Sequence, residues 1–476
     1  MGIADDVTKL IGRPQDEGLM YRAVLPSARE IGQIICSLAN TRGGFLVLGV
    51  VENDNGLFIS GLSEDFQTSA IVRKAIELLS PKPLVQHDYV VYEGKRLYAI
   101  KVERSAVPVR IEGRVPDALP SARSSQGVLF AWLHISDLHF GHGDAAHSSD
   151  QVLVTTDLRR DIATVLGQGA PAPSAILITG DIAFSGHTRL RPGDQPSQEY
   201  PDAQRFLLSL GQVVGLDARR IFVVPGNHDV QRPADKVRNI RRLRDELREG
   251  KEPLDVALAH VEDRNLLAQR QANYLAFSAS FAPACLDAGG GAAPEQRLWW
   301  WHREQASSGL KLRLIGLNTA LLAADEQDQG RLALGKAPLA EVLTAPPTEP
   351  DELVVVLSHH PFQGGWLRDE KEIDAWVRSH AHLHLFGHVH EADSEEARSG
   401  AGGAFVRVAA GAAHGEQDAP EAHGYNVAAV IRGPKGELRL RLWPRRWSGK
   451  NKAFRPDTDN LPDGQLFAEH VLRLRL

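Results

Sequence analysis

Short apolar runs alternate with longer polar segments between residues 127 and 387 of the chain. Six runs have the length of buried strands, and each ends in Gly, Ser, Asn or a polar cluster: 127–136, 174–180, 220–226, 310–318, 353–358 and 382–387. Strand, loop and helix repeated in this way are typical of an α/β sheet whose functional loops leave the strand ends. We therefore expect an α/β fold for the larger part of the chain.

The first hundred or so residues have a different rhythm. Apolar positions at helical spacing predict helices over 28–40 and 68–81, the second stopped by Pro81. The continuous apolar run at 45–51 predicts a buried strand, and residues 87–103 predict a hairpin that turns at Glu93 and Gly94. These elements predict a compact α+β domain.

A change of composition marks the boundary between the two regions. Residues 112–127 are rich in Pro, Gly, Ser and Arg, which is typical of a linker. A chain of 476 residues is also too long for one ordinary core. We therefore expect a domain at 1–111, a linker at 112–127 and a second domain at 128–476 with a helical insertion at about 231–310.

Composition restricts the class of protein. With 43% hydrophobic and 24% charged residues and a mean hydropathy of -0.24, the chain is typical of a soluble globular protein. No apolar run approaches the length of a spanning helix, and the N-terminus is acidic where a signal peptide is basic, so we expect a cytoplasmic protein without a membrane partner. The net charge of -6 argues against a surface that coats nucleic acid uniformly, although local basic patches stay open. Cys36 and Cys285 are expected to be buried free thiols.

Candidate metal ligands follow five of the six apolar runs. In chain order they are Asp137 and His139, Asp181, Asn227 and His228, His359 and His360, and His388 and His390. One histidine in one loop would mean little, because most histidines bind no metal. Two divalent ions held close together need a bridging carboxylate, oxygen and nitrogen ligands, and open positions for water and substrate. The set offers these groups and no thiolate, which disfavours a closed structural zinc site.

The ordered series D-x-H, G-D, G-N-H-D, H and G-H-x-H resembles the calcineurin-like metallophosphoesterase superfamily over residues 129–445. The resemblance implies an α/β fold in which a β-sandwich is flanked by helices. It implies two metal sites that share Asp181 as a bridge: Asp137, His139, Asp181 and His390 for one ion, and Asp181, Asn227, His359 and His388 for the other. His359 is preferred because the family's ligand precedes x-Pro, with His360 as the alternative.

The same resemblance implies a mechanism. Activated water attacks phosphorus in line, and His228, which is not a ligand, donates a proton to the leaving oxygen or stabilises its charge. The expected cofactors are two divalent ions, Mn²⁺ first, with Fe, Zn or Ni as alternatives. Substrate-binding residues are not assigned.

One loop departs from a well-known branch of the superfamily. Protein serine/threonine phosphatases resemble GDYVDRG here, whereas this chain has Phe184 and Ser185 in place of the later Asp and Arg. That subclass is therefore disfavoured, and the loop is similar to class III cyclic-nucleotide phosphodiesterases and their relatives. Glu199 and Tyr200 begin the next helix, where either helix N-terminal chemistry or substrate contact would explain them.

Two basic stretches could hold a polyanion. Arg238, Arg241, Arg242 and Arg248 fall largely along one side of a helix, and residues 443–455 interleave Arg and Lys with Trp and Phe. A solvated helix face and an edge hairpin packed on its aromatic side chains explain the two stretches equally well.

The N-terminal region resembles the AlbA-type domain of Schlafen proteins over residues 1–115, on the segments 37–53 and 71–83. The resemblance implies a small α+β domain that binds nucleic acid or nucleotides. Glu17 lacks its expected carboxylate partner, because Met20 and Tyr21 stand in that setting. We therefore expect a nucleic-acid-binding or dimerising module, and not a second nuclease.

Three functions stay open at this point. The first is a metal-dependent nuclease of DNA or RNA, in a domain combination that resembles effectors of bacterial defence. The second is a phosphodiesterase for a cyclic or small nucleotide. The third, a non-catalytic nucleotide sensor, is disfavoured by the complete ligand set.

Overall fold

The computed structural model describes residues 3–13, 15, 18–22, 28–53, 56–62, 68–111, 127–143, 145–167, 169–186, 198–281, 297–306, 309–344, 348–349, 351–390, 392–398, 404–414, 423–433, 436–462 and 465–474. Glu17, Cys285 and all of the expected linker except Gly127 lie outside these residues. The chain divides into two compact units, one made of 1–128, 159–174 and 210–216 and the other of the remaining residues.

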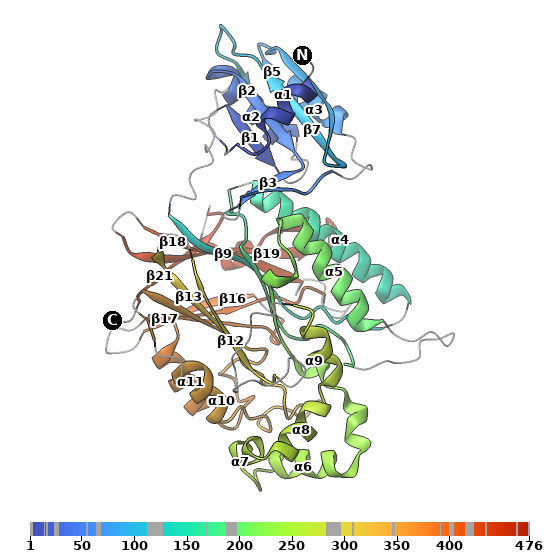
Figure 1. Ribbon diagram of the computed structural model, residues 1–476, viewed down its shortest axis with the longest axis vertical. Helices are drawn as coiled ribbons and strands as arrows, with labels where there is room; N and C mark the ends of the chain where they lie inside the picture. The colour runs from blue at the N-terminus through green and yellow to red at the C-terminus, as the bar shows by residue number, and fades with distance from the viewer. Residues whose placement is uncertain are drawn as a thin grey trace. The chain divides into compact units, whose positions relative to one another are not determined.

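The N-terminal unit is built on a four-stranded sheet in the order β1–β2–β7–β6. Its elements, blue in Figure 1, are α1 (Ile3–Leu10), β1 (Leu19–Arg22), α2 (Ala28–Asn40), β2 (Gly44–Leu48), α3 (Thr68–Glu77), β6 (Val85–Tyr92) and β7 (Lys95–Val102). Leu46 and Leu48 pack in one core cluster with residues of α2 and α3, and Val47 packs in another with Val7 of α1. The alternation of side chains along β2 therefore fills a core on each face of the sheet.

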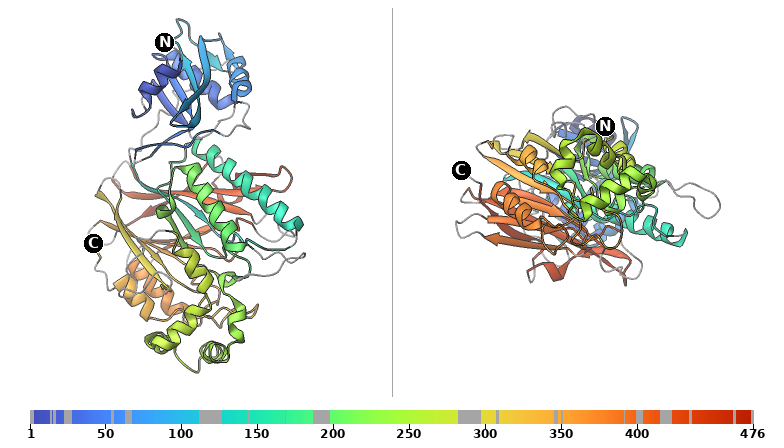
Figure 2. Two further views of the ribbon diagram at one scale, coloured as in Figure 1. Left: turned by 45° about the vertical axis from the view of Figure 1, so that its right-hand side comes forward. Right: turned by 90° about the horizontal axis from the view of Figure 1, so that it is seen from below.

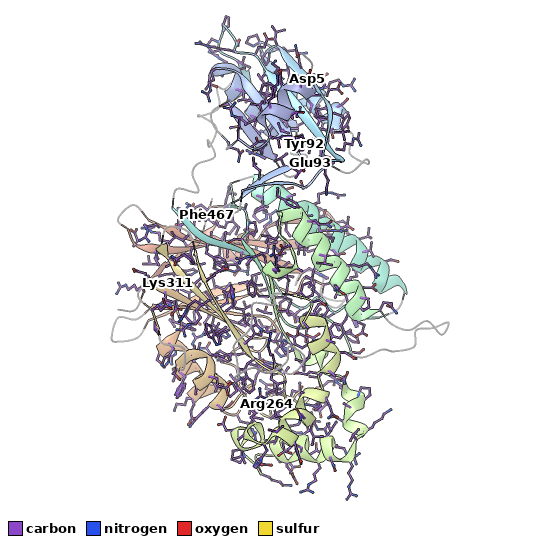
Figure 3. All side chains as sticks on the ribbon, viewed as in Figure 1. Asp5, Tyr92, Glu93, Arg264, Lys311 and Phe467 are labelled. Atoms are coloured by element: carbon purple, nitrogen blue, oxygen red, sulfur yellow. The ribbon has the colours of Figure 1, made fainter. Side chains whose placement is uncertain are left out.

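Most predictions for this unit are confirmed. The helix at 28–40 is α2, and β6 and β7 form the predicted hairpin. Glu93, labelled in Figure 3, and Gly94 form its turn, and both have positive φ. Such a turn matches the natural twist of a hairpin. Cys36 is fully buried as expected, its thiol donates to the Val109 carbonyl at 3.1 Å, and burial raises the pKa of that thiol.

Two predictions for this unit were wrong in detail. The apolar run at 45–51 is not one strand, because Gly49, at φ 92°, separates β2 from β3 (Val50–Asn53), which pairs with β4 (Gly56–Ile59) in a separate ribbon. The helix expected to reach residue 81 ends at Glu77, and β5 (Leu79–Ser80) then pairs with β8 (Arg110–Ile111). The residue before a proline prefers extended backbone, which favours the strand at Ser80.

The larger unit contains two sheets. The first has seven described strands: β9 (Val128–Ile135), β10 (Ala175–Thr179), β11 (Ile221–Val224), β18 (Gly424–Arg432), β19 (Leu438–Ser448), β20 (Ala453–Pro456) and β21 (Ala468–Leu472). The second has six: β12 (Trp300–Gln305), β13 (Lys311–Gly316), β14 (Glu352–Leu357), β15 (Leu383–Phe386), β16 (Asp393–Arg398) and β17 (Ala404–Ala409). The indole N–H of Trp300 donates to the Val223 carbonyl at 3.0 Å and thereby joins the two sheets.

All six predicted apolar runs are strands of this unit. They divide equally between the sheets, with β9, β10 and β11 parallel in the first and β13, β14 and β15 parallel in the second. Strands β10, β11 and β14 are buried along their whole length, which explains why their sequences are continuous apolar runs. Figure 2 shows the two sheets from further sides.

The helices after β9 are α4 (Ala145–Gly167), α5 (Glu199–Val214), α6 (Arg238–Arg248), α7 (Leu254–Ala259), α8 (Val261–Gln269), α9 (Ala272–Ser278), α10 (Ala337–Leu339) and α11 (Glu370–His380). Residues 159–167 of α4 and 210–214 of α5 are counted with the first unit, and the other residues of these helices with the larger unit. Helices α6 to α9 occupy much of the expected insertion, whereas β12, at its end, belongs to the second sheet. No helix among the described residues combines the length and the apolarity that a membrane span requires.

The two basic stretches, 443–455 and α6, do not form continuous exposed cationic surfaces, because part of each is buried or paired with carboxylates. In the hairpin, Trp443, Trp447 and Phe454 are buried, and Arg446 pairs with Asp459, so the aromatic side chains belong to the core. On α6, Arg238, Arg241 and Arg242 are exposed. Arg248 instead is buried, where it pairs with Asp328 and lies 3.0 Å from Asp325. Its guanidinium therefore ties α6 to the loop after β13.

Candidate metal centre

The predicted site residues lie in the loops that leave β9, β10, β11, β14 and β15. Parallel strands direct their carboxyl ends to the same edge of a sheet, which brings loops from distant parts of the sequence together. Backbone hydrogen bonds join loops within each sheet: Asp137 N–H donates to the Gly180 carbonyl at 3.0 Å, and Gly387 N–H donates to the His359 carbonyl at 3.1 Å. His388 N–H donates to Oδ2 of Asp137 at 3.1 Å and connects the loops of the two sheets, so the loops form one continuous site.

The backbone of these loops adopts a conformation that side chains normally avoid. Eight non-glycine residues of the described chain have positive φ, and five of them are predicted ligands, with φ between 48° and 68°: Asp137, His139, Asp181, His388 and His390. Left-handed backbone costs roughly 1–2 kcal/mol per residue with a Cβ atom. Strain of this kind gathers at functional sites, where the surrounding structure holds it in place.

Asp181 lies at the centre of the site. Its Oδ2 atom is 3.3 Å from Nε2 of His139 and 3.2 Å from Nε2 of His359, one histidine from each predicted ligand set. Its Oδ1 atom accepts the backbone N–H of His228 at 2.8 Å. One carboxylate oxygen therefore faces both sets, which is the position that a bridging ligand requires.

Asp137 and His390 complete the first set. Nε2 of His390 lies 3.3 Å from Oδ1 of Asp137, while Oδ2 of Asp137 accepts the backbone N–H of His388 at 3.1 Å. The ligand atoms of Asp137, His139 and His390 all lie within 4.8 Å of one another. Such a separation suits side chains that share one cation.

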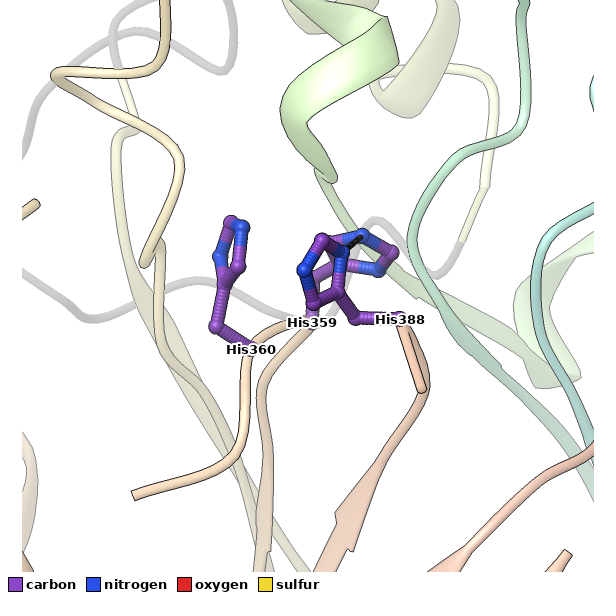
Figure 4. A group of neighbouring side chains, drawn as sticks. All are labelled: His359, His360 and His388. Atoms are coloured by element: carbon purple, nitrogen blue, oxygen red, sulfur yellow. Dashed lines mark hydrogen bonds between the residues drawn. The ribbon is translucent and has the colours of Figure 1, made fainter. Parts of the chain in front are cut away.

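The second set gathers around His359. Its Nε2 atom lies 3.0 Å from Oδ1 of Asn227 and 3.2 Å from Nδ1 of His388 (Figure 4). His360 stands beside this pair in the same view, with its ring centroid 4.4 Å from that of His388, and its Nδ1 is hydrogen-bonded to the Thr319 hydroxyl at 2.9 Å. His359 reaches Asp181 and Asn227 as well as His388 and stays the predicted ligand, with His360 as the alternative.

Three backbone carbonyls orient the imidazole rings. Nδ1–H of His139 donates to His414 O at 3.2 Å, that of His359 to Thr179 O at 2.8 Å, and that of His228 to Phe184 O at 2.7 Å. Because each Nδ1 is engaged, the Nε2 atom of each ring faces the centre. Carbonyls behind metal-binding histidines fix the tautomer in this way. Nothing in the sequence indicated these partners.

Burial and neighbouring charges shift the pKa values of the two carboxylates in opposite directions. Burial raises the pKa of Asp181, but His359, His228 and His139 together hold it well below its usual value. Asp137 shows the same balance, with His390 and His359 lowering its pKa. Burial lowers the pKa of His359, yet the charge and hydrogen bond of Asp181, together with the charge of Asp137, outweigh burial and raise the pKa to about 9. Without a metal, protons on the imidazoles therefore offset the buried negative charge.

The donor set fits divalent cations. Two fully buried carboxylates, an amide oxygen and imidazole nitrogens are the groups that Mn²⁺, Fe²⁺, Zn²⁺ and Ni²⁺ accept. Cations would displace the imidazole protons that face Asp181 and take over their role in neutralising the carboxylates. Asp137, His139, Asp181, Asn227, His359, His388 and His390 would hold two such ions.

Glu199 and Tyr200 support the loops. Ser185 Oγ–H donates to Glu199 at 2.6 Å, and the Tyr200 hydroxyl donates to Oδ1 of Asp229 at 3.1 Å. Asp229 also accepts N–H groups from both neighbouring loops, including that of Gly226 at 2.9 Å. The pair therefore holds the loop of Asp181 against the loop of His228, a role that the sequence did not indicate.

Glycine is required where the loops approach each other most closely. A Cβ atom on Gly226 would collide with Oδ1 of Asp181, and one on Gly387 would collide with the Ser136 hydroxyl. Neither glycine has positive φ, so the requirement is close approach and not backbone conformation.

Comparison with known proteins agrees with this geometry. Residues 132–392 match the calcineurin-like phosphoesterase family, and because the match spans more than half of the chain, this protein belongs to that family. Residues 17–117 match the Schlafen AlbA_2 family. The predicted fold class, a metallophosphoesterase β-sandwich preceded by an AlbA-type domain, is confirmed. Members of the calcineurin-like family are phosphoesterases that use divalent metals.

Individual relatives are distant. The uncharacterized metallophosphoesterase-like protein YydB of Bacillus subtilis is 24% identical over 266 residues, which are 55% of this chain and 48% of YydB. The chain thus spans about half the length of this curated relative. A conserved uncharacterized protein from Streptococcus pneumoniae, a predicted phosphoesterase, is 11% identical at a TM-score of 0.23 over 72% of this chain and 97% of its own. The N-terminal domain of a RecG-related protein from Nitrosomonas europaea is 17% identical at a TM-score of 0.20, over 25% of this chain and 86% of its own.

Asp181→Asn should lower metal content and activity together. The substitution removes the charge that faces both ligand sets, so bound metal should fall from two ions per chain to one or none, and phosphoester hydrolysis should be lost. Elemental analysis after gel filtration measures the first effect, and a chromogenic phosphodiester measures the second. Asp202→Asn on α5 is the matched control and should change neither. Two tightly bound ions in Asp181→Asn would contradict the bridging role.

Proposed function

We propose that this protein is a dinuclear metal-dependent phosphodiesterase that cleaves nucleic acid, either DNA or RNA. The observation that carries the proposal is the position of Asp181 Oδ2, at 3.3 and 3.2 Å from histidines of two ligand sets. Two cations bound there would activate water and stabilise the charge on the phosphoryl oxygens. Mn²⁺ is the proposed ion, and the same ligands accept Fe, Zn or Ni.

His228 is the proposed catalytic residue. Its ring is held by Phe184 O and presents Nε2, and burial lowers its pKa against the raising effect of Asp181. A proton on Nε2 could pass to the leaving oxygen without disturbing the Nδ1 hydrogen bond. The charge of Arg232, which is exposed on the same loop, also lowers the pKa of His228. Its guanidinium is a suitable contact for a phosphate oxygen.

Nucleic acid is the proposed substrate because of the N-terminal unit. Its match to the Schlafen AlbA_2 family supports nucleic-acid binding, and pairing such a unit with a phosphoesterase resembles a defence nuclease. We also propose an N-terminal domain at 1–111, a linker at 112–127 and a catalytic domain at 128–476. The proposed location is the cytoplasm. Dimerisation is the alternative role that we propose for the N-terminal unit.

A phosphodiesterase for cyclic or small nucleotides is the second candidate. The loop at 180–186, with Phe184 and Ser185, is similar to class III cyclic-nucleotide phosphodiesterases and favours it. Both activities require the same two ions, so a substrate panel decides between them. With Mn²⁺ present, we expect cleavage of single- or double-stranded DNA or RNA. Hydrolysis of cyclic nucleotides alone would contradict the proposal, and no hydrolysis at all would favour a sensor.

His228→Ala should slow catalysis while leaving metal content near that of the wild type. Loss of a general acid costs about 10²–10⁴ in rate. A nitrophenyl phosphodiester, whose leaving group needs little protonation, should be affected less than an oligonucleotide. His380→Ala on α11 is the matched control and should change neither rate. Equal losses on both substrates would argue against proton transfer by His228.

Deleting residues 1–120 should weaken the cleavage of long substrates and leave the hydrolysis of short ones nearly unchanged. A tethered binding unit raises the local concentration of polynucleotide without altering the chemistry. Hydrolysis of a small chromogenic diester should therefore stay nearly unchanged. Cleavage of long nucleic acid should weaken through apparent affinity and become less sensitive to salt, because fewer phosphate contacts release counterions. Equal cleavage of long substrates at every salt concentration would instead favour dimerisation.

A further inference from the structure

Three aromatic rings lie in a row beside the first ligand set, those of His142, Phe184 and His228. The ring centroid of Phe184 lies 4.1 Å from that of His142, with the planes 38° apart, and 4.9 Å from that of His228, with the planes 27° apart. His139 of the first set has ring contacts with all three. The phenyl ring is therefore packed between two imidazoles, and the proposed chemistry assigns it no role.

The backbone of Phe184 is fixed by contacts that do not involve its ring. Its N–H donates to the Phe140 carbonyl at 2.9 Å, and Phe140 forms an isolated β-bridge with Ala183. The next residue is held as well, because Ser185 N–H donates to Glu199 at 3.0 Å. The phenyl ring is therefore carried by a well-anchored loop, and removing the ring would leave these backbone contacts in place.

Phe184 holds His228 at two points. Its carbonyl accepts Nδ1–H of His228 at 2.7 Å, and its ring stacks on the imidazole. The hydrogen bond alone does not fix the plane of the imidazole, because carbonyl oxygens accept from a broad range of directions. Stacked rings attract each other at centroid separations of about 4.5–7 Å, and such contact restricts the plane. The two contacts together fix the direction in which Nε2 points.

His228 needs such support more than the ligand histidines do. His139 and His359 would be held at both ring nitrogens, by a backbone carbonyl at Nδ1 and by a cation at Nε2. His228 is not a proposed ligand, so no cation would hold its Nε2 atom. A proton donor must lie within hydrogen-bond reach of the leaving oxygen, and a displacement of about 1 Å can cost roughly 10²-fold in rate. The stacked ring supplies the constraint that a cation supplies elsewhere.

We propose that Phe184 is a positioning residue for His228. Its ring, backed by His142 on the other face, fixes the plane of the imidazole so that Nε2 meets the leaving oxygen. This inference rests on the proposed role of His228 as proton donor and goes beyond it. The inference does not depend on the choice between a polynucleotide and a cyclic nucleotide, because both have an alkoxide leaving group that needs a proton. A second aromatic ring should replace Phe184, whereas an aliphatic side chain should not.

The test compares two substrates that differ in leaving group. One is the oligonucleotide or cyclic nucleotide that the substrate panel identifies, and the other is a nitrophenyl phosphodiester of a nucleotide. Values of kcat and KM are measured for the wild type, Phe184→Leu, Phe184→Tyr, His228→Ala and the double variant Phe184→Leu/His228→Ala. Phe184→Leu retains apolar bulk and the carbonyl that accepts from His228. The matched control is Phe467→Leu, because Phe467, labelled in Figure 3, is also half-buried and packs beside Trp443. Elemental analysis gives the metal content of each variant.

Phe184→Leu should lower kcat on the alkoxide-leaving substrate about ten- to hundred-fold, with KM and metal content close to those of the wild type. On the nitrophenyl diester the loss should be much smaller, because that leaving group needs little protonation. Phe184→Tyr, which keeps a flat ring, should stay close to the wild type, as should Phe467→Leu. The double variant should be no slower than His228→Ala, because a positioning residue acts only through the residue that it positions.

Several results would overturn the inference, and they differ from a failure of the proposed function. If Phe184→Leu keeps the wild-type kcat, or if Phe184→Tyr is as slow as Phe184→Leu, a flat ring does not orient His228. If Phe184→Leu loses metal, slows both substrates equally or slows His228→Ala further by the same factor, the ring only supports the loop. If His228→Ala itself slows both substrates equally, the proposed role of His228 fails first. No hydrolysis of any substrate by the wild type would overturn the proposed function and the inference together.

Discussion

The constraint on which the site depends is the burial of two carboxylates, Asp137 and Asp181, at the junction of the two sheets. Burial opposes their ionisation, yet the surrounding imidazoles hold the pKa of each well below its usual value. Neutralising positive charge must therefore come from within the site. His359, whose pKa is raised to about 9, supplies part of it in the metal-free protein, and divalent cations would supply it when bound.

The remaining structure arranges ligands around this charge. Parallel strands bring five loops to one place, and glycines at 226 and 387 let those loops approach within contact of Asp181 and Ser136. Five of the predicted ligands accept left-handed backbone, at a cost of roughly 1–2 kcal/mol each. Glu199, Tyr200 and Asp229 then hold the loops against each other, and backbone carbonyls turn each Nε2 toward the centre. Fold stability and metal affinity are therefore coupled through the same contacts.

Much of this arrangement could be predicted because motif order and apolar runs are local properties. The six runs are strands, and the motif series identified the fold class. The resemblance implied a β-sandwich, but the assignment of individual runs to the two sheets was not predicted, because apolar pattern alone does not say which strands pair. The carbonyls behind His139 and His359 could not be predicted, since those contacts join residues 275 and 180 positions apart. The sequence pattern likewise places Arg248 on a basic helix face, whereas its partners, Asp325 and Asp328, lie in a distant loop that the pattern does not indicate. The roles of the individual ligands stay predictions.

The central claim is that Asp181 bridges two cations. Anomalous diffraction from crystals grown with Mn²⁺ tests it most directly, because each bound ion gives its own peak. The account predicts two peaks roughly 3.5–4 Å apart, both in contact with Asp181. One ion should also contact Asp137, His139 and His390, and the other should also contact Asn227, His359 and His388. A single peak, or two peaks of which one lies away from Asp181, would contradict it.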